Sequence, residues 1–236
     1  MNTAVRIAEN LAKIRGRISE AALRSGREPS DVTLVAVTKY VDIATTRAVV
    51  AAECFELGES RPQQLCAKAS ELADERVRWH LVGHLQRNKI RRTLAHNVLI
   101  HSVDRESTLQ AIDRIAGDLS VDTQVLIEVN TSGDASKDGI APAAVAQLIE
   151  SAGSLPHVRV CGLMTMAALE GNDDVTRRNF NDLRELRNRL SMNLPKNVTL
   201  NDLSMGMSND FEIAIEQGAT LVRVGSAIVE GVTMQS

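Results

Sequence analysis

The stretch that decides the fold is Thr33-Leu34-Val35-Ala36-Val37-Thr38-Lys39, a nearly continuous β-branched and apolar run that ends on an amine. Such a run is typical of a parallel strand buried on both faces, so we expect a strand here. Lys39 has two interpretations. It is either the first exposed residue after the strand, or a partly desolvated amine at the mouth of a barrel, where loss of water favours the neutral form that attacks aldehydes.

Outward from this stretch, the strand pattern recurs seven times, and helical spacing follows each strand except the last. Further strands are predicted at 54–57, 77–82, 97–103, 123–130, 158–164, 198–203 and 221–224. Helices are predicted at 42–53, 62–73, from about 86, at 105–119, from Pro142, around 180–190 and at 208–217. The alternation predicts a single (β/α)8 TIM barrel, with a doubly wound open sheet as the alternative.

An additional amphipathic helix precedes the repeats, because Ile7, Leu11, Ile14 and Ile18 lie on one helical stripe. No linker or composition break interrupts the chain. We therefore expect residues 1–236 to form one domain, with residues 1–28 as an N-terminal helix packed on the barrel.

Composition points to a small-molecule ligand. The 236 residues are 44% hydrophobic but only 2% aromatic, which suits a barrel filled with small branched side chains. A net charge of -3 with scattered basic residues predicts neither nucleic acid nor membrane as a partner. The three cysteines form no CxxC pair, and no signal peptide or spanning segment is present, so we expect a cytoplasmic protein without disulfides.

Two segments follow the last two predicted strands, where barrel enzymes commonly hold a phosphate: residues 203–208 and 223–228, here called the phosphate cup. Their glycines permit close backbone approach, and their hydroxyls can donate to phosphate oxygens. The structural alternative is that Ser208 caps a helix and Gly225 only makes a tight turn. The predicted phosphate contacts are Ser204, Gly206, Gly225 and Ser226.

Other polar residues have competing interpretations. Arg223 lies inside an apolar strand, so it is either paired with an acid or directed at a ligand. His80 and His84 have the spacing of a helical metal pair, but the residues between them read as strand and turn, and we expect no metal. His101 is interpreted as a core histidine with satisfied hydrogen bonds. A phosphate, a ring facing Arg223 and the Lys39 amine together describe pyridoxal 5′-phosphate (PLP).

With these residues in place, the chain resembles the YggS/PROSC family of pyridoxal phosphate homeostasis proteins over nearly its full length. The most specific blocks are Trp79-His80-Leu81-Val82-Gly83-His84-Leu85-Gln86-Arg87-Asn88-Lys89 and Leu203-Ser204-Met205-Gly206-Met207-Ser208. The resemblance implies a covalent Schiff base on Lys39 and an arginine, Arg223, facing the pyridine nitrogen. It places at the cofactor Lys39, Ser60, His84, Met164, Ser204, Met205, Gly206, Arg223, Gly225 and Ser226.

The chain departs from this family in two places. Ser60-Arg61-Pro62 follows Gly58-Glu59 where the family usually has Asn-Tyr, and Tyr40 follows Lys39 where a small hydroxyl residue is usual. These departures leave open how the cofactor is contacted on the second strand.

Alanine racemases, whose N-terminal barrel is similar, supply the enzymatic alternative. They need a second domain with a catalytic tyrosine opposite the lysine, whereas this chain ends at Ser236 and its only tyrosine is Tyr40. One base cannot efficiently invert a stereocentre. We therefore expect a non-catalytic PLP carrier in vitamin B6 homeostasis, a monomer whose partners are PLP and PLP-dependent apoenzymes. A weak PLP-dependent amino-acid racemase is the alternative, and a Schiff-base aldolase is a third reading.

Overall fold

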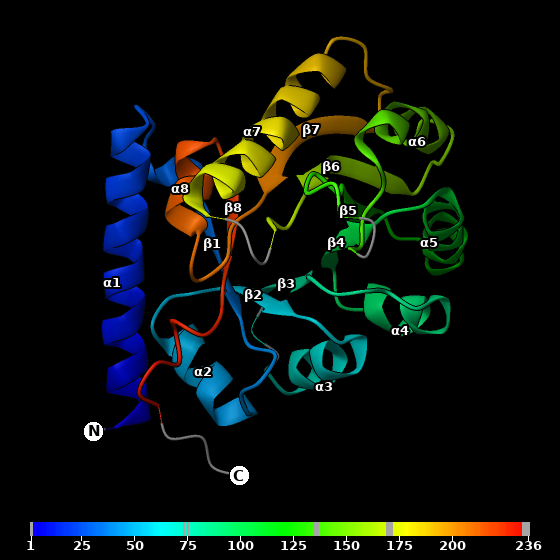
Figure 1. Ribbon diagram of the computed structural model, residues 1–236. Helices are drawn as coiled ribbons and strands as arrows, with labels where there is room; N and C mark the ends of the chain where they lie inside the picture. Colours follow the sequence, from blue (N-terminus) through cyan, green and yellow to red (C-terminus); the bar gives the residue numbers. More distant parts are fainter. Residues whose placement is uncertain (1, 73, 75, 135–136, 169–171, 233–236) are drawn as a thin grey trace.

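The computed structural model describes residues 2–72, 74, 76–134, 137–168 and 172–232. Over these residues, eight parallel strands are hydrogen-bonded in chain order and close into a barrel where β8 pairs with β1 (Figure 1). The strands are β1 (Thr33–Val37), β2 (Glu56–Glu59), β3 (Arg78–Leu81), β4 (Val98–Val103), β5 (Thr123–Glu128), β6 (Val158–Met164), β7 (Val198–Ser204) and β8 (Leu221–Val224). The predicted (β/α)8 barrel is confirmed.

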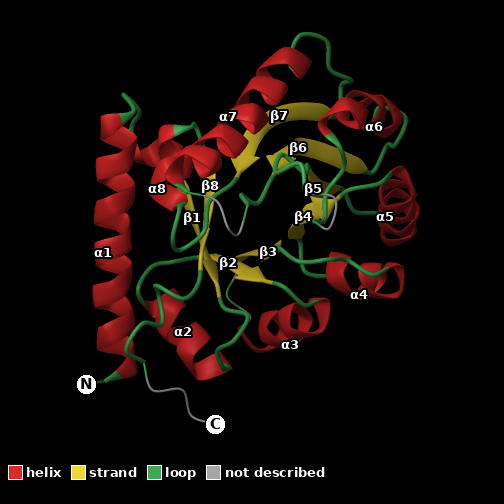
Figure 2. Ribbon diagram, viewed as in Figure 1, coloured by secondary structure: helices red, strands yellow, loops and turns green. Residues whose placement is uncertain are grey.

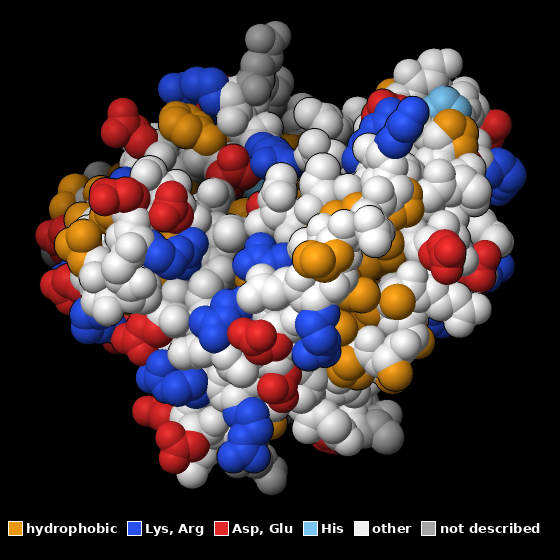
Figure 3. Space-filling view, turned by 90° about the horizontal axis from the view of Figure 1, so that it is seen from above, with side chains coloured by type: hydrophobic (Ala, Val, Ile, Leu, Met, Phe, Trp, Pro, Cys, Tyr) orange, Lys and Arg blue, Asp and Glu red, His pale blue; other side chains and the backbone are white. Residues whose placement is uncertain are grey.

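Helices surround the barrel on its outside (Figure 2). They are α1 (Thr3–Arg24), α2 (Ile43–Ala51), α3 (Pro62–Leu72), α4 (Ile90–Leu94), α5 (Glu106–Leu119), α6 (Val145–Ala152), α7 (Asp173–Leu190) and α8 (Phe211–Glu216), with short 3-10 turns at Pro29–Asp31, Arg87–Lys89 and Pro142–Ala144. None of the helices within the described ranges has the length and apolarity needed to cross a membrane. Basic and acidic side chains are interspersed over the face shown in Figure 3, and hydrophobic side chains gather on its right-hand part.

The N-terminal helix α1 forms because its apolar residues share one face. Asn2 caps its first turn by accepting from the amide of Ala4, and the predicted stripe from Ile7 to Ile18 is buried. This stripe packs against α8 and α2 (Figure 1). Asn10 on the same helix is also buried, and its amide nitrogen donates to the carbonyls of Ile228 and Glu230, both at 2.9 Å. Helix α1 therefore holds the segment that follows β8.

The inside of the barrel holds both an apolar cluster and a set of polar side chains. Positions paired in parallel register share a face, so Val35 on β1 and Arg223 on β8, which are paired, both point inward. A small apolar cluster fills part of the interior and consists of Val35, Leu99, Leu126, Met164 and Leu221. The remaining inward positions carry polar side chains that belong to the candidate site.

Most predicted boundaries agree with the structure to within two residues, but β2 was misplaced. It was predicted at 54–57 with Gly58 as its end, whereas the strand runs from Glu56 to Glu59. Gly58 is an interior strand position, where an added Cβ would lie 3.1 Å from Val35 and 3.2 Å from Val37. Its missing side chain makes room for β1. Ala73, the last residue of the helix predicted after the second strand, and residues 233–236 lie outside the described residues.

Candidate functional site

The β1–β8 seam brings the predicted amine and the phosphate cup to the same rim of the barrel. Ala36 pairs with Val224, the last residue of β8, so Gly225 leaves the sheet beside Val37. A Cβ on Gly225 would lie 3.2 Å from the Val37 carbonyl oxygen. Lys39 follows Val37 by two residues. Lys39 and Gly225 therefore emerge from adjacent strands at the carboxyl-terminal end.

Lys39 itself is half-buried, just past the last residue of β1. Its amine lies 4.9 Å from the centroid of the Tyr40 ring, and Tyr40 is 74% exposed. The backbone before it is firmly held, since the Thr38 amide donates to the Gly58 carbonyl at 2.8 Å. The backbone next to Lys39 is thus held by its hydrogen bond to β2.

A buried ion pair that the sequence did not predict anchors this corner. The Lys68 amine, on α3, donates to the Thr38 carbonyl at 2.7 Å and to Glu59 Oε1 at 2.6 Å. The Thr38 hydroxyl donates to the same carboxylate oxygen at 2.7 Å. We call Thr38, Glu59 and Lys68 the corner cluster; all three are buried. The cluster links the end of β1 to β2 and α3 through Thr38, the residue immediately before Lys39.

The two segments of the phosphate cup lie side by side. The Arg223 amide donates to the Gly206 carbonyl at 3.0 Å, which joins them at their base. The amides of Gly225 and Ala227 both point at the Ser208 hydroxyl oxygen, at 3.2 and 3.5 Å. Ser208 therefore does not cap α8 in the way the structural alternative supposed. Its oxygen marks a point where two backbone N–H groups converge, as they do at anion sites.

Gly206 is required by the shape of the cup. Its φ is +93°, and an added Cβ would lie 2.5 Å from the Ala214 Cβ and 2.9 Å from the Phe211 Cα. A side chain would be strained by the backbone conformation and would collide with α8. The tight packing holds the segment after β7 against that helix.

Arg223 is buried, with its guanidinium held on two sides. Nη1 donates to Ser204 Oγ at 2.6 Å and Nη2 donates to the Thr165 carbonyl at 3.0 Å. Burial lowers the pKa of Arg223 to about 10, although the charges of Glu128 and Asp210 oppose the shift. The group remains a cation at neutral pH.

Ser204, predicted as a phosphate contact, lies in the interior instead of on the open rim. Its hydroxyl has no exposed surface and contacts Arg223 and His101, the latter at 2.9 Å. The structure therefore groups Ser204 with Arg223, whereas Gly225 and the exposed Ser226 lie beyond the end of β8. The predicted contact of Ser204 with a phosphate stays a prediction.

The remaining predicted residues occupy different environments. Ser60 is half-buried and packs on Gly83, where an added Cβ would be 2.3 Å from the Ser60 carbonyl oxygen. His84 is exposed, whereas Met164 is 1% exposed within the interior apolar cluster and Met205 is fully buried in the core. Their contacts with a cofactor stay predictions.

Glu128, at the end of β5, is an acid that sequence reasoning missed. Burial raises its pKa to about 7, the carboxylates of Asp138 and Asp104 add to the shift, and the charge of Arg223 opposes it. Perturbed acids of this kind gather at functional sites. The only signal for it in the sequence was that a polar residue ends a buried strand.

These groups match the chemistry of a phosphorylated pyridine aldehyde. A primary amine suits the aldehyde, converging backbone amides suit the phosphate, and a guanidinium, which can only donate, suits an unprotonated ring nitrogen. The absence of a side chain at Gly225 lets the segment after β8 pack against Val37 at the end of β1. The residues present therefore fit such a group.

Comparison with known proteins agrees with this geometry. Residues 6–231 match the family described as "Alanine racemase, N-terminal domain". The chain is 39% identical over 220 residues to the pyridoxal phosphate homeostasis protein of Aquifex aeolicus, covering 93% of this chain and 96% of that one. It is 40% identical over 222 residues to the protein of that name from Pseudomonas aeruginosa, covering 94% of each.

A solved structure is similar over nearly the whole chain. PipY of Synechococcus elongatus PCC7942, with PLP bound, superposes with a TM-score of 0.82 and 36% identity, covering 94% of this chain and 99% of that one. The barrel and the relatives thus agree on one family.

Proposed function

This chain belongs to the pyridoxal phosphate homeostasis proteins, within the alanine racemase N-terminal domain family, and we propose that it carries and buffers PLP through a Schiff base on Lys39. In forming it, the Lys39 amine adds to the aldehyde carbon and water leaves. The barrel together with α1 acts as one cofactor-binding domain. PLP-dependent apoenzymes are the proposed recipients, and the carrier acts as a monomer.

The observation that supports this proposal most directly is the β1–β8 seam. Because Gly225 packs beside Val37, the Lys39 side chain and the phosphate cup both begin at the same rim of the barrel. An amine and an anion site that share one rim suit the two ends of PLP.

Arg223 favours a carrier over an enzyme. PLP supplies an electron sink for amino-acid chemistry when its ring nitrogen is protonated. A guanidinium facing that nitrogen has no lone pair to accept its proton, so Arg223 keeps the nitrogen unprotonated. Tyr40, the one tyrosine of the sequence, lies next to Lys39 and cannot serve the opposite face of the ring. The residues therefore hold the cofactor without activating it.

An absorbance titration tests the proposal. Wild-type protein mixed with PLP should develop the visible band of a protonated imine, and Lys39→Ala should abolish it because no amine remains at that point. Borohydride reduction and peptide mapping should place the pyridoxyl group on Lys39.

Lys137→Ala is the matched control, because Lys137 is a second lysine near the mouth whose amine is engaged by the Ala167 carbonyl at 2.7 Å. It should leave the band and the labelled peptide unchanged. A Lys39→Ala protein that still forms the imine would remove the assignment. If the PLP-loaded wild type converts L-alanine to D-alanine, the carrier hypothesis is wrong and the racemase hypothesis takes its place.

A further inference from the structure

Five polar side chains form a continuous hydrogen-bonded series across the inside of the barrel, here called the interior chain. It links Arg223 Nη1 to Ser204 Oγ (2.6 Å), Ser204 Oγ to His101 Nδ1 (2.9 Å), His101 Nε2 to His80 Nδ1 (2.9 Å) and His80 Nε2 to Glu56 Oε2 (2.5 Å). The two histidines and the serine have no exposed surface, whereas the Glu56 side chain is 30% exposed. Glu56 is therefore the point at which this chain meets water.

The two ends of the interior chain fix the direction of every hydrogen bond in it. Arg223 can only donate, and an ionised Glu56 can only accept. Burial disfavours ionisation of Glu56, but the hydrogen bond from His80 holds its pKa below the usual value. With both rings neutral, Ser204 donates to His101, His101 donates from Nε2 to His80, and His80 donates from Nε2 to Glu56. The opposite tautomers would leave a bare ring nitrogen facing the carboxylate.

The surroundings keep both rings neutral. Burial lowers the pKa of His80, although Glu56 opposes the shift. Burial also lowers the pKa of His101 well below its usual value, and the charges of Arg223 and Arg78 reinforce the shift. Each ring therefore carries a single N–H, and the chain has one consistent arrangement.

We infer that Glu56, His80 and His101 are positioning residues for the cofactor site, acting through Ser204 on Arg223. They hold the serine proton on the side of His101, so that Ser204 always presents a lone pair to Arg223. With the Thr165 carbonyl accepting from its other nitrogen, the guanidinium is then held in one orientation. This inference rests on the PLP site proposed above.

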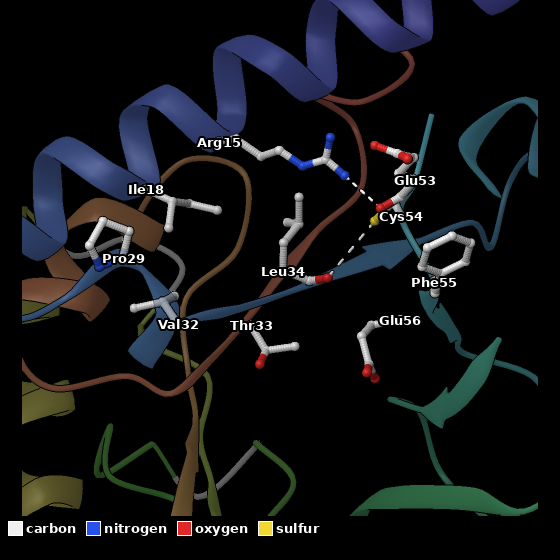
Figure 4. A pocket seen from close by; sticks show the side chains of 10 residues that line it. All are labelled: Arg15, Ile18, Pro29, Val32, Thr33, Leu34, Glu53, Cys54, Phe55 and Glu56. Carbon is white, nitrogen blue, oxygen red and sulfur yellow. Dashed lines mark hydrogen bonds between the residues drawn. The ribbon is translucent and has the colours of Figure 1, made fainter. Parts of the chain in front are cut away.

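The interior chain also extends the site to the opposite rim of the barrel. Glu56 lines a cleft of about 370 Å³ between α1 and the first residues of β1 and β2, together with Arg15, Thr33 and Glu53 (Figure 4). Arg15 donates there to the carbonyls of Ala52 and Glu53, at 3.1 and 2.8 Å. A change at this amino-terminal rim should therefore alter PLP binding at the other end.

Tautomer measurements test the inference without any cofactor. Long-range 1H–15N spectra of 15N-histidine protein should show His80 and His101 as neutral rings protonated on Nε2, with resonances assigned by His→Gln variants. In Glu56→Ala, the acceptor is lost, and both rings should populate the other tautomer. Glu53→Ala, which removes a carboxylate from the same cleft without touching the interior chain, should leave the spectra unchanged.

PLP titrations complete the test. Glu56→Ala should raise the dissociation constant about tenfold, the equivalent of one net hydrogen bond, while the Lys39 imine still forms. Should Glu56→Ala not fold, Ser204→Ala interrupts the chain next to Arg223: Glu56 should still hold both ring tautomers, while the affinity for PLP falls by a similar factor. Glu56→Ala protein with wild-type tautomers, or either variant with wild-type affinity, would overturn the inference. Wild type that binds no PLP but shows the expected tautomers would instead contradict the proposed function.

Discussion

Two buried polar networks of this barrel, the corner cluster and the interior chain, differ in where they end. The corner cluster, between β1, β2 and α3, is short and buried, because Lys68 donates to the Thr38 carbonyl and to Glu59 Oε1 within it. The interior chain runs from β8 through the barrel to water at Glu56. The comparison separates a network that fixes backbone from one that holds a functional group.

The same comparison explains why one lysine of this corner is structural and the other is the candidate nucleophile. The Lys68 amine is buried and bonded to two oxygens, so its lone pair is not available for an aldehyde. Lys39 begins one residue after the Thr38 carbonyl that Lys68 binds, and its own amine rests over the Tyr40 ring. Two lysines that meet at one corner of the barrel thus take opposite roles.

Removing one partner of the corner cluster should give the largest effect. Lys68→Met leaves the Glu59 carboxylate buried without its cation, and the free energy of unfolding in urea should fall by about 3–5 kcal/mol. The double change Lys68→Met/Glu59→Leu should recover most of the loss, while Lys13→Met on the exposed face of α1 serves as control. A single change that costs under about 1 kcal/mol would show that the cluster does not hold the corner.

A second test concerns Glu128, whose charge acts on Arg223 at one end of the interior chain. Its pKa of about 7, against an ordinary value of 4.5, means that the folded protein keeps a proton that the unfolded chain releases. Stability is therefore lost as pH rises from 4.5 to above 7. Glu128→Gln should be more stable than wild type at pH 8 by up to about 3 kcal/mol and equal to it near pH 4.5. Urea unfolding measures this, with exposed Glu20→Gln as control; equal stability at both pH values would refute it.

The smallest expected effect comes from His101. Its lowered pKa means that the unfolded chain binds a proton below about pH 6.5 while the folded protein does not, so stability falls as pH drops through this window. His101→Gln should remove about 1 kcal/mol of that loss between pH 6.5 and 5.5, measured by urea unfolding. The exposed His84→Gln should keep the wild-type slope, and an identical slope in both variants would contradict a neutral buried ring.

The fold was predictable where apolar runs have clear ends. The strands 158–164 and 221–224 were predicted with the bounds that the structure has, because β-branched runs there are bounded by turn residues. The error at β2 arose because Cys54 and Phe55 look like strand residues, and Gly58 looks like a stop. Only the packing of Gly58 against Val35 and Val37 explains why the strand continues.

The site was predictable only in part. The position of Lys39 and of the two cup segments follows from the repeat, because all strand ends of a parallel barrel meet at one rim. His101 is, as predicted, a buried and hydrogen-bonded histidine. The interior chain was missed because it joins residues on five strands, whose relative register is set by barrel closure. The sequence signal for it lies in β2 and β3, where polar and apolar residues alternate. Glu56 and His80 occupy inward positions there, and their partners on the adjacent strand are the polar Arg78 and the small Gly58.

The hydrogen bonds from Asn10 to the carbonyls of Ile228 and Glu230 have a consequence for the order of folding. They join residues that are 218 and 220 positions apart, so α1 can hold the segment after β8 only when the whole barrel sequence lies between them. Lys39 and Gly225 likewise become neighbours only where β8 pairs with β1, so the rim that carries both cannot form before the barrel closes.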